Sequence, residues 1–455
     1  MGLCFGQLGD ECPDLDNSAL LIRAFNVVQG LLAEKLISAG HDISDGGILT
    51  TVSEMCFGSK YGVNLSLTSK SSIWGELFAQ ELGYVVGCNE DDVPHITNHL
   101  NKEGVPNRVI GRVTEEQRIR INFAGNSVLD CSTDNLRREW ERTSYEIAKT
   151  RMNPDIVRRE RRNTAKRSVP VYHLTFTPEA TPVSVLNASN KHRVAVIREQ
   201  GSNGHEEMIA AFKRAGFEVW DVHMSDLESG KLKDLNMFRG IIFPGGFSYG
   251  DVLGAAVGWS LKIMRNPRLK KIFDDFFART DTFSFGICNG AQLGLRCGWA
   301  PLPDLDTKRQ PRFTVNASGA FEHRWVRLKI IESQSIMFAG MEGSILGTYV
   351  ANMEGRFNCD HDPGVLNRVM AEKLVPIVYV DSRGHRTTAP PYCPSGSFVA
   401  GVCDPTGRHS YVMPHLFDRA SLLRQWEYVP PKWSKLEASP WLQLGHNVRI
   451  WCDNN

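Results

Sequence analysis

A chain of 455 residues is long enough for two or three domains, and its apolar fraction of 42% is ordinary for globular cores. The 52 basic and 51 acidic side chains leave a formal charge of +1, so the sequence lacks the basic excess that a nucleic-acid partner requires. No stretch approaches the ~18 uninterrupted apolar residues of a membrane span, and the first residues lack the basic and apolar regions of a signal peptide. We therefore expect a cytoplasmic protein with no membrane and no nucleic-acid partner. The eleven cysteines are never spaced as C-x-x-C, which predicts neither a disulfide framework nor a zinc site.

The first region of the chain combines helical and strand patterns. Apolar residues recur at helical spacing over 20–36, 48–57, 73–82 and 92–103. Short apolar or alternating runs over 63–67, 84–88, 108–113 and 119–123 predict strands. Because these strands follow one another with short connections, we expect an α+β domain with antiparallel character that ends near Ser144.

A polar loop lies between the first two predicted helices, with the sequence His41-Asp42-Ile43-Ser44-Asp45-Gly46-Gly47. Carboxylates ligate Mg²⁺, and backbone amides at the start of a helix face phosphate oxygens. The loop therefore suits a metal–phosphate group. The same residue types also suit an Asx-type turn that caps the following helix. From the residues alone, both interpretations stay open.

A polar and basic stretch separates this region from the next. Arginines and lysines cluster over 158–167, which suits either a nuclear targeting signal or a solvated helix face. Prolines, serines and threonines are frequent over 168–190, a composition typical of a connection between domains. We predict a first domain over 1–145, a linker over 146–191 and a second domain over 192–455.

The second domain alternates strands and helices. Buried-strand patterns over 194–197, 218–222, 240–244 and 283–287 are separated by glycine loops and amphipathic helical stretches. This rhythm predicts an α/β fold with a doubly wound parallel sheet. In such folds the active site lies at the carboxyl ends of the strands.

A cysteine takes the place of the serine in a nucleophile-elbow pattern at the end of the last of these strands. The segment Gly286-Ile287-Cys288-Asn289-Gly290 has glycines on both sides of the cysteine, as the strand-to-helix corner requires. We expect an exposed sulfur, and the following helix N-terminus favours its thiolate form. The alternative is a buried structural cysteine, which is the common state of this residue type.

A cysteine nucleophile needs a base, an orienting group and donors for the oxyanion. His415 is the best-placed histidine, because the apolar run before it predicts a strand that delivers it to a strand end. Asp418 follows three residues later and is a candidate to hold the imidazole. The backbone of Gly245-Gly246 and the amide of Asn289 are the candidate oxyanion donors, because glycine lets the substrate approach closely.

Several motifs of the second domain resemble the glutamine amidotransferase domain of the phosphoribosylformylglycinamidine synthase family. They are Arg198-Glu199-Gln200-Gly201-Ser202-Asn203, Pro244-Gly245-Gly246-Phe247-Ser248-Tyr249-Gly250-Asp251, Gly286-Ile287-Cys288-Asn289-Gly290, Met413-Pro414-His415 and Ser439-Pro440-Trp441-Leu442-Gln443-Leu444. The first domain is similar to the end of that family's synthetase region through Phe5-Gly6-Gln7-Leu8-Gly9, His41-Asp42-Ile43-Ser44-Asp45-Gly46-Gly47 and Leu77-Phe78-Ala79-Gln80-Glu81-Leu82-Gly83. The resemblance implies a flavodoxin-like class I amidotransferase domain, preceded by part of a domain like the C-terminal domain of aminoimidazole ribonucleotide synthetase-like proteins.

The resemblance also implies a reaction. Cys288 would attack the side-chain amide of glutamine to give a γ-glutamyl thioester, and His415 would pass protons as ammonia leaves. The family is a ligase of de novo purine biosynthesis that makes formylglycinamidine ribonucleotide from formylglycinamide ribonucleotide, glutamine and ATP. Asp42 would match a magnesium ligand, and Ser44 a contact to ATP or ADP at an auxiliary nucleotide site. Most of the formylglycinamide ribonucleotide site lies outside this chain, which implies a further synthetase portion.

Two positions depart from the family pattern. The family's third triad residue is an acid two places after the histidine, where this chain has Phe417, and Asp418 comes one place later. A one-residue bulge would bring Asp418 into register. Asn352-Met353 replaces the usual His-Gly pair before Glu354. Two other functions stay open, namely a thiol hydrolase on the same sheet and a non-catalytic fragment or scaffold that keeps the fold.

Overall fold

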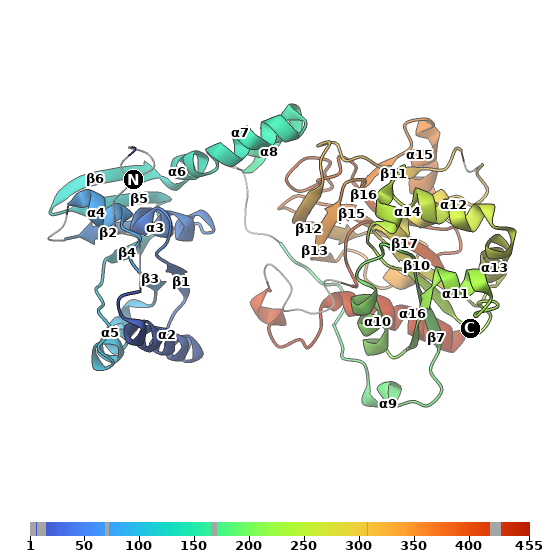
Figure 1. Ribbon diagram of the computed structural model, residues 1–455, viewed down its shortest axis with the longest axis horizontal. Helices are drawn as coiled ribbons and strands as arrows, with labels where there is room; N and C mark the ends of the chain where they lie inside the picture. The colour runs from blue at the N-terminus through green and yellow to red at the C-terminus, as the bar shows by residue number, and fades with distance from the viewer. Residues whose placement is uncertain (1–5, 7–14, 69–71, 165–170, 307, 419–428) are drawn as a thin grey trace. The chain divides into compact units, whose positions relative to one another are not determined.

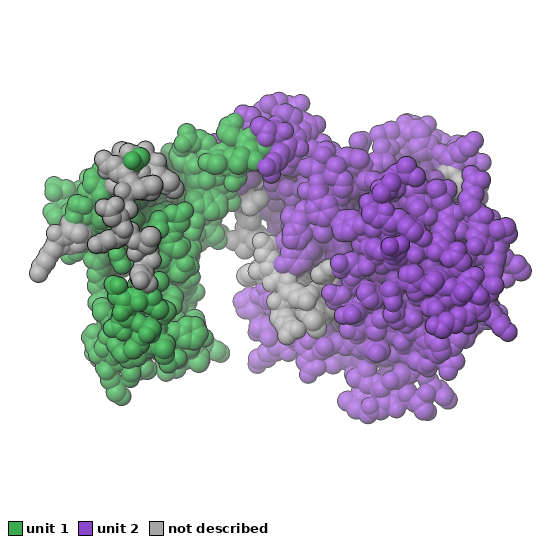
Figure 2. Space-filling view, in the orientation of Figure 1, with its two compact units in different colours: residues 1–147 green, residues 148–455 purple. Residues whose placement is uncertain are grey.

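The computed structural model describes residues 6, 15–68, 72–164, 171–306, 308–418 and 429–455 (Figure 1). The chain divides into two compact units, residues 1–147 and 148–455, which Figure 2 shows in different colours. Apart from Gly6, the resemblance motif at 5–9 lies outside the described residues. None of the helices in the described ranges is long and apolar enough to cross a membrane.

The first unit contains two small sheets with helices packed on them. Its four-stranded sheet has the order β4 (Gly111–Thr114), β2 (Gly62–Leu67), β5 (Arg118–Phe123) and β6 (Asn126–Ser132). β2 and β5 pair in parallel and the other neighbours are antiparallel. A two-stranded antiparallel sheet joins β1 (Ala39–Asp42) and β3 (Tyr84–Gly87). The helices are α2 (Ser18–Ala33), α3 (Gly47–Phe57), α4 (Ile73–Phe78), α5 (Val93–Lys102) and α6 (Thr133–Trp140).

Helix α3 fixes the position of the loop over 41–47. It buries Ile48, Val52 and Cys56, which recur at helical spacing, against apolar residues of β2 and β5. Gly46 and Gly47 have φ of 86° and 66°, so the loop turns sharply into the helix. The α+β prediction is confirmed for this unit.

Two predicted boundaries in this unit were wrong, and one strand was missed. Helix α2 ends at Ala33 rather than near residue 36, and the residues after it form β1, which is mostly exposed and forms by pairing with β3 rather than by burial. Strand β6 was not predicted at all. Helix α4 ends at Phe78 rather than near 82, because Ala79 has an extended ψ of 135°.

The predicted linker includes helical segments, and one of them packs within the second unit. α7 covers Arg142–Arg151, α8 covers Pro154–Thr164 and α9 covers Val183–Leu186. In α8, Val157 is buried, Glu160 pairs with Arg324 at 2.7 Å, and Asn163 Nδ2 donates to Pro390 O at 2.7 Å. Residues 153–164 are therefore held by side-chain contacts rather than by chain connectivity alone.

The second unit is built on a nine-stranded mixed sheet. Its parallel part has the order β17 (His409–Val412), β10 (Phe283–Ile287), β9 (Gly240–Phe243), β7 (Arg193–Arg198) and β8 (Glu218–His223). An antiparallel extension beyond β17 consists of β16 (Val399–Cys403), β15 (Ile377–Tyr379), β12 (Glu322–Ile330) and β13 (Ile345–Asn352). The predicted parallel sheet is confirmed, and the antiparallel extension is an addition that the strand and helix rhythm did not reveal.

Helices cover both faces of the parallel part, as a doubly wound fold requires. One face carries α12 (Val257–Arg265), α13 (Pro267–Ala278) and α14 (Asn289–Arg296), and the ring of Phe243 meets Trp259 and Phe273 there. The other face carries α10 (His205–Arg214) and α16 (Gln443–Asn454), where Phe212 packs on Phe283. All five residues of β10 are buried, so this central strand is held rigidly from both sides.

Candidate active site

The backbone at Cys288 forms a tight corner between β10 and α14. Cys288 has φ of 53° and ψ of −110°, an unusual conformation for a residue with a side chain. Such conformations cost of order 1–3 kcal/mol and persist only where the surroundings impose them. A Cβ on Gly286 would lie 2.6 Å from Gly290 O, and one on Gly290 would lie 2.1 Å from Phe243 O. Both glycines are therefore required, as the elbow pattern predicted.

The sulfur of Cys288 is buried rather than exposed, so this part of the prediction was wrong. The residue is 4% exposed, and its Sγ lies 3.7 Å from Ala351 O near the end of β13. The cover comes from the antiparallel extension, a long-range element that the local elbow pattern does not include. A shielded thiol is compatible with a nucleophile, because exclusion of water strengthens the electrostatic interactions around the reacting atoms.

His415 reaches the same place from the neighbouring strand. β17 and β10 are parallel, with Val412 paired to Ile287, so the residues that follow them meet at one sheet edge. Strand β13 also holds His415 directly, since its amide donates to Tyr349 O at 2.8 Å and Thr348 Oγ1 donates to its carbonyl. Cys288 and His415 interact through their side chains. The structure thus brings these two predicted residues together.

Asp418 is the acid that contacts the imidazole. Its Oδ2 lies 2.7 Å from His415 Nδ1, and the residue is 2% exposed. Phe417, at the position where the family has its acid, points instead into the core, where its ring packs on Phe212 at 4.9 Å. The turn after β17 therefore supplies the extra residue that brings the next acid to the histidine.

Opposing effects act on the pKa of His415. Burial alone lowers it, but the negative charge and hydrogen bond of Asp418, together with the Cys288 side chain, raise it to about 10. The imidazole therefore carries a proton on both nitrogens at neutral pH. A positive charge is then held beside the Cys288 sulfur, which is the arrangement that activates a thiol nucleophile.

The loop after β9 passes directly beside this pair. A Cβ on Gly245 would lie 3.1 Å from His415 Cε1 and 3.4 Å from Cys288 Cβ, so only glycine leaves room there. Three amides of the loop are already engaged, those of Phe247 to Gly201 O, Ser248 to Asn289 Oδ1 and Tyr249 to Gln200 O. The amides of Gly245, Gly246 and Asn289 have no acceptor among the described residues. They therefore stay candidate donors for an oxyanion.

Comparison with known proteins identifies the second unit. Residues 191–452, more than half of the chain, match the CobB/CobQ-like glutamine amidotransferase domain. The chain belongs to this family. Residues 6–123 match the C-terminal domain of AIR synthase related proteins.

Longer relatives contain both of these domains' sequences. The chain is 43% identical to the probable phosphoribosylformylglycinamidine synthase, chloroplastic/mitochondrial, of Arabidopsis thaliana, over 99% of this chain and 32% of that protein. It is 38% identical to phosphoribosylformylglycinamidine synthase of Homo sapiens, over 98% of this chain and 34% of that protein. The chain thus spans about a third of the length of these relatives. Among solved structures it is similar to PurLQS from Thermotoga maritima, with a TM-score of 0.42 and 23% identity, covering 58% of this chain and 99% of that one.

A polar network around Asn289 was not predicted from the sequence. The Asn289 side chain is 1% exposed, and its Nδ2 donates to Asp251 Oδ1 at 3.1 Å and to Gln292 Oε1 at 3.0 Å. Its Oδ1 accepts from Ser248 N at 3.2 Å. Burial raises the pKa of Asp251, while its hydrogen bonds from Ala256 N and Asn289 oppose that shift. The pairing joins residues 38 apart in sequence, so no local spacing signals it.

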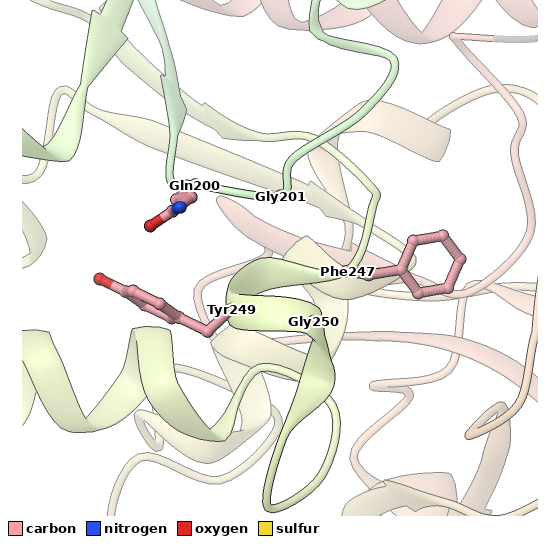
Figure 3. A pocket seen from close by; sticks show the side chains of 5 residues that line it. All are labelled: Gln200, Gly201, Phe247, Tyr249 and Gly250. Atoms are coloured by element: carbon pink, nitrogen blue, oxygen red, sulfur yellow. The ribbon is translucent and has the colours of Figure 1, made fainter.

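A cavity of about 560 Å³ is lined by Gln200, Gly201, Phe247, Tyr249 and Gly250. Figure 3 shows the side chains of Gln200 and Tyr249 extending into the same space, while the ring of Phe247 points away. The Tyr249 ring rests on Gly258, where a Cβ would lie 2.6 Å from Cδ2. Beneath it, buried Glu199 pairs with Lys262 at 3.1 Å. The sequence motifs over 198–203 and 244–251 indicated both loops that line the cavity, but they did not predict this ion pair.

Asp42 and Ser44 are both exposed in the first unit. The Asp42 carboxylate lies 3.3 Å from His41 Nδ1, and His41 Nε2 lies 2.8 Å from Glu54 Oε2. No side chain caps α3 at Gly46, so an Asx-type cap does not form. The described residues contain no group of three side chains suited to holding a metal ion. These residues alone therefore do not fit a magnesium site, and we derive no chemical step through a metal.

Proposed function

We propose that the second unit hydrolyses the side-chain amide of glutamine at Cys288 and releases ammonia. One observation carries the proposal, namely a cysteine on a strained corner whose side chain interacts with a buried histidine–aspartate pair. Membership of the glutamine amidotransferase family supports glutamine as the substrate.

The first half of the reaction forms a thioester. The Cys288 sulfur attacks the side-chain carbonyl carbon, the C–S bond forms, and the carbonyl electron pair moves onto oxygen. The amides of Gly245, Gly246 and Asn289 stabilise the resulting oxyanion, because their N–H groups have no acceptor among the described residues. His415 gives its Nε2 proton to the amide nitrogen, the C–N bond breaks, and ammonia leaves.

The second half regenerates the sulfur nucleophile. Neutral His415 takes a proton from water, and the hydroxide oxygen attacks the thioester carbonyl carbon. The C–S bond then breaks, giving glutamate and a thiolate beside protonated His415. Asp418 remains ionised throughout, because its function is to hold the imidazole orientation and to stabilise its positive charge.

The ammonia is used, in this proposal, by the rest of a longer enzyme. We infer that the complete protein converts formylglycinamide ribonucleotide to formylglycinamidine ribonucleotide with ATP in de novo purine biosynthesis, because relatives of that name align along nearly all of this chain. Asp42 and Ser44 would contribute to a nucleotide and magnesium site only together with residues outside this chain. We place the enzyme in the cytoplasm, which microscopy of a fluorescent fusion of the complete protein tests.

Ammonia release from glutamine by the purified chain tests the central proposal, with and without ATP and formylglycinamide ribonucleotide. We expect Cys288→Ala to lower the rate of ammonia release by a factor of at least about 10³. Release that persists in this variant would overturn the nucleophile assignment. A glutamine-analogue electrophile separates the alternatives, because labelling of Cys288 without turnover would indicate a binding scaffold, and absence of both would exclude a glutamine site.

A further inference from the structure

The loop that follows the candidate oxyanion glycines has a strained backbone. Between 249 and 256, four residues with side chains have left-handed φ, namely Tyr249 at 55°, Asp251 at 50°, Leu253 at 73° and Ala256 at 58°. Left-handed backbone costs free energy in residues other than glycine, and it persists only where surrounding contacts impose it. The loop therefore needs anchors. Backbone hydrogen bonds from Asn203 N to Gly245 O, Phe247 N to Gly201 O and Tyr249 N to Gln200 O hold its first part, and two groups of side-chain contacts hold it as well.

One anchor holds the far end of the loop. Ala255 N donates to Glu354 Oε1 at 3.0 Å, and Arg296 Nε donates to Ala255 O at 2.6 Å. These contacts bind the loop to α14 and to the turn after β13, away from the glycines that face the nucleophile.

The other anchor lies beside Cys288. Asp251 Oδ1 accepts from Asn289 Nδ2, and Asn289 Oδ1 accepts from Ser248 N. An amide side chain can flip its oxygen and nitrogen, but here Nδ2 must face acceptors because Asp251 has only oxygens to offer. The carboxylate therefore forces the Asn289 oxygen toward Ser248. A second acceptor, Gln292 Oε1 at 3.0 Å, supports the same orientation.

We propose that Asp251 is a positioning residue for glutamine hydrolysis, which acts through the Asn289 side chain to hold Ser248 and so to aim the free amides of Gly245 and Gly246. This inference rests on the proposed function, because the aimed amides matter only if an oxyanion forms at Cys288. Asp251 itself contacts neither the sulfur nor the imidazole. Its effect is on the developing oxygen charge, since misplaced donors stabilise a transition state poorly.

Two variants of Asp251 separate the anchor from the backbone. Asp251→Gly removes the acceptor without adding left-handed strain, whereas Asp251→Asn keeps an acceptor oxygen and tolerates left-handed φ. Val252→Gly is the matched control, because it adds the same flexibility to a residue that is 66% exposed. We expect Asp251→Gly to lower kcat of ammonia release at least 10-fold with KM within about 3-fold, while Asp251→Asn and Val252→Gly stay within about 5-fold.

Alkylation of Cys288 by iodoacetamide provides a readout that a general structural defect would also change. This reaction displaces iodide at carbon and forms no oxyanion, so we expect the Asp251→Gly rate to stay within about 2-fold of the parent chain. A parallel fall in alkylation and hydrolysis would overturn the inference, since the anchor would then act on the thiol. Equal kcat values for Asp251→Gly and Val252→Gly would also overturn it.

Amide hydrogen exchange tests the anchor independently of turnover. We expect the peptide covering 245–250 to exchange at least about 5-fold faster in Asp251→Gly than in Val252→Gly, because Ser248 N loses a fixed acceptor. Equal exchange in the two variants would refute the positioning of the loop. Ammonia release that survives Cys288→Ala would instead refute the proposed function, and the exchange comparison would still decide the structural claim.

Discussion

Replacement of Asp418 by asparagine tests the electrostatics of the candidate triad. The pKa of His415 is about 10, against an ordinary value of 6.5, although burial alone would lower it. That difference corresponds to about 5 kcal/mol in favour of the protonated imidazole, at 1.36 kcal/mol per pKa unit. Asp418 lies 2.7 Å from Nδ1 and is itself buried, so it is the main source of this stabilisation. Asparagine keeps the shape of the side chain but removes its charge.

The loss of that charge should change the pKa of His415, the rate of hydrolysis and the stability of the chain. The pKa of His415 should fall toward or below 6.5, because burial is then opposed only by the Cys288 side chain. The alkaline limit of the pH–kcat profile should move to lower pH, and kcat at its optimum should fall by about 10²–10⁴, as expected when a histidine loses its orienting acid. The free energy of unfolding should also fall in this variant. The raised pKa stabilises the folded chain fully below pH 6.5, and that contribution disappears as pH rises through about 10.

The assay is ammonia release between pH 5 and 10.5, with urea unfolding of the same samples. Asp404→Asn is the matched control, because Asp404 is also buried but accepts from His409 N and Thr406 rather than from the candidate site. We expect the control to leave the alkaline limit in place. An unchanged limit in Asp418→Asn would refute the assignment of Asp418 as the residue that holds His415 protonated.

Two further predictions concern steric space and acid stability. Gly245→Ala should lower kcat at least 10-fold without a comparable loss of stability, because the new methyl group would lie 3.1 Å from His415 Cε1. A kcat equal to that of the parent chain would contradict this close approach. Burial, assisted by the charge of Arg449, lowers the pKa of His446 to about 4. The neutral imidazole therefore stabilises the folded chain above pH 6.5. This contribution, at most about 3 kcal/mol, is lost as the pH falls from 6.5 toward 4. In His446→Gln the urea concentration at the midpoint of unfolding should therefore change less between pH 6.5 and pH 4 than in the parent chain. An equally steep dependence of the midpoint on pH would show that other groups dominate.

Local sequence was sufficient for the elements that carry the candidate nucleophile and base. The glycines at 286 and 290 are needed because backbone atoms pass within a few ångströms of each, and this requirement is visible in the spacing of five residues. The buried run before Cys288 and the apolar run before His415 predicted strands that end at one sheet edge. Both features depend on side-chain size and hydrophobicity along a short segment, which the sequence displays directly.

Contacts between distant segments were decided only by the tertiary structure. Asp418 rather than position 417 meets His415 because Phe417 is drawn into the aromatic core beside Phe212, a contact between residues about 200 apart. Cys288 is covered by β13, whose antiparallel pairing has no counterpart in the strand and helix rhythm. Asp251 reaches Asn289 only because the loop after β9 folds back over α14. Spacing along the chain therefore determined which residues are chemically suited to the site, and packing determined which of them meet.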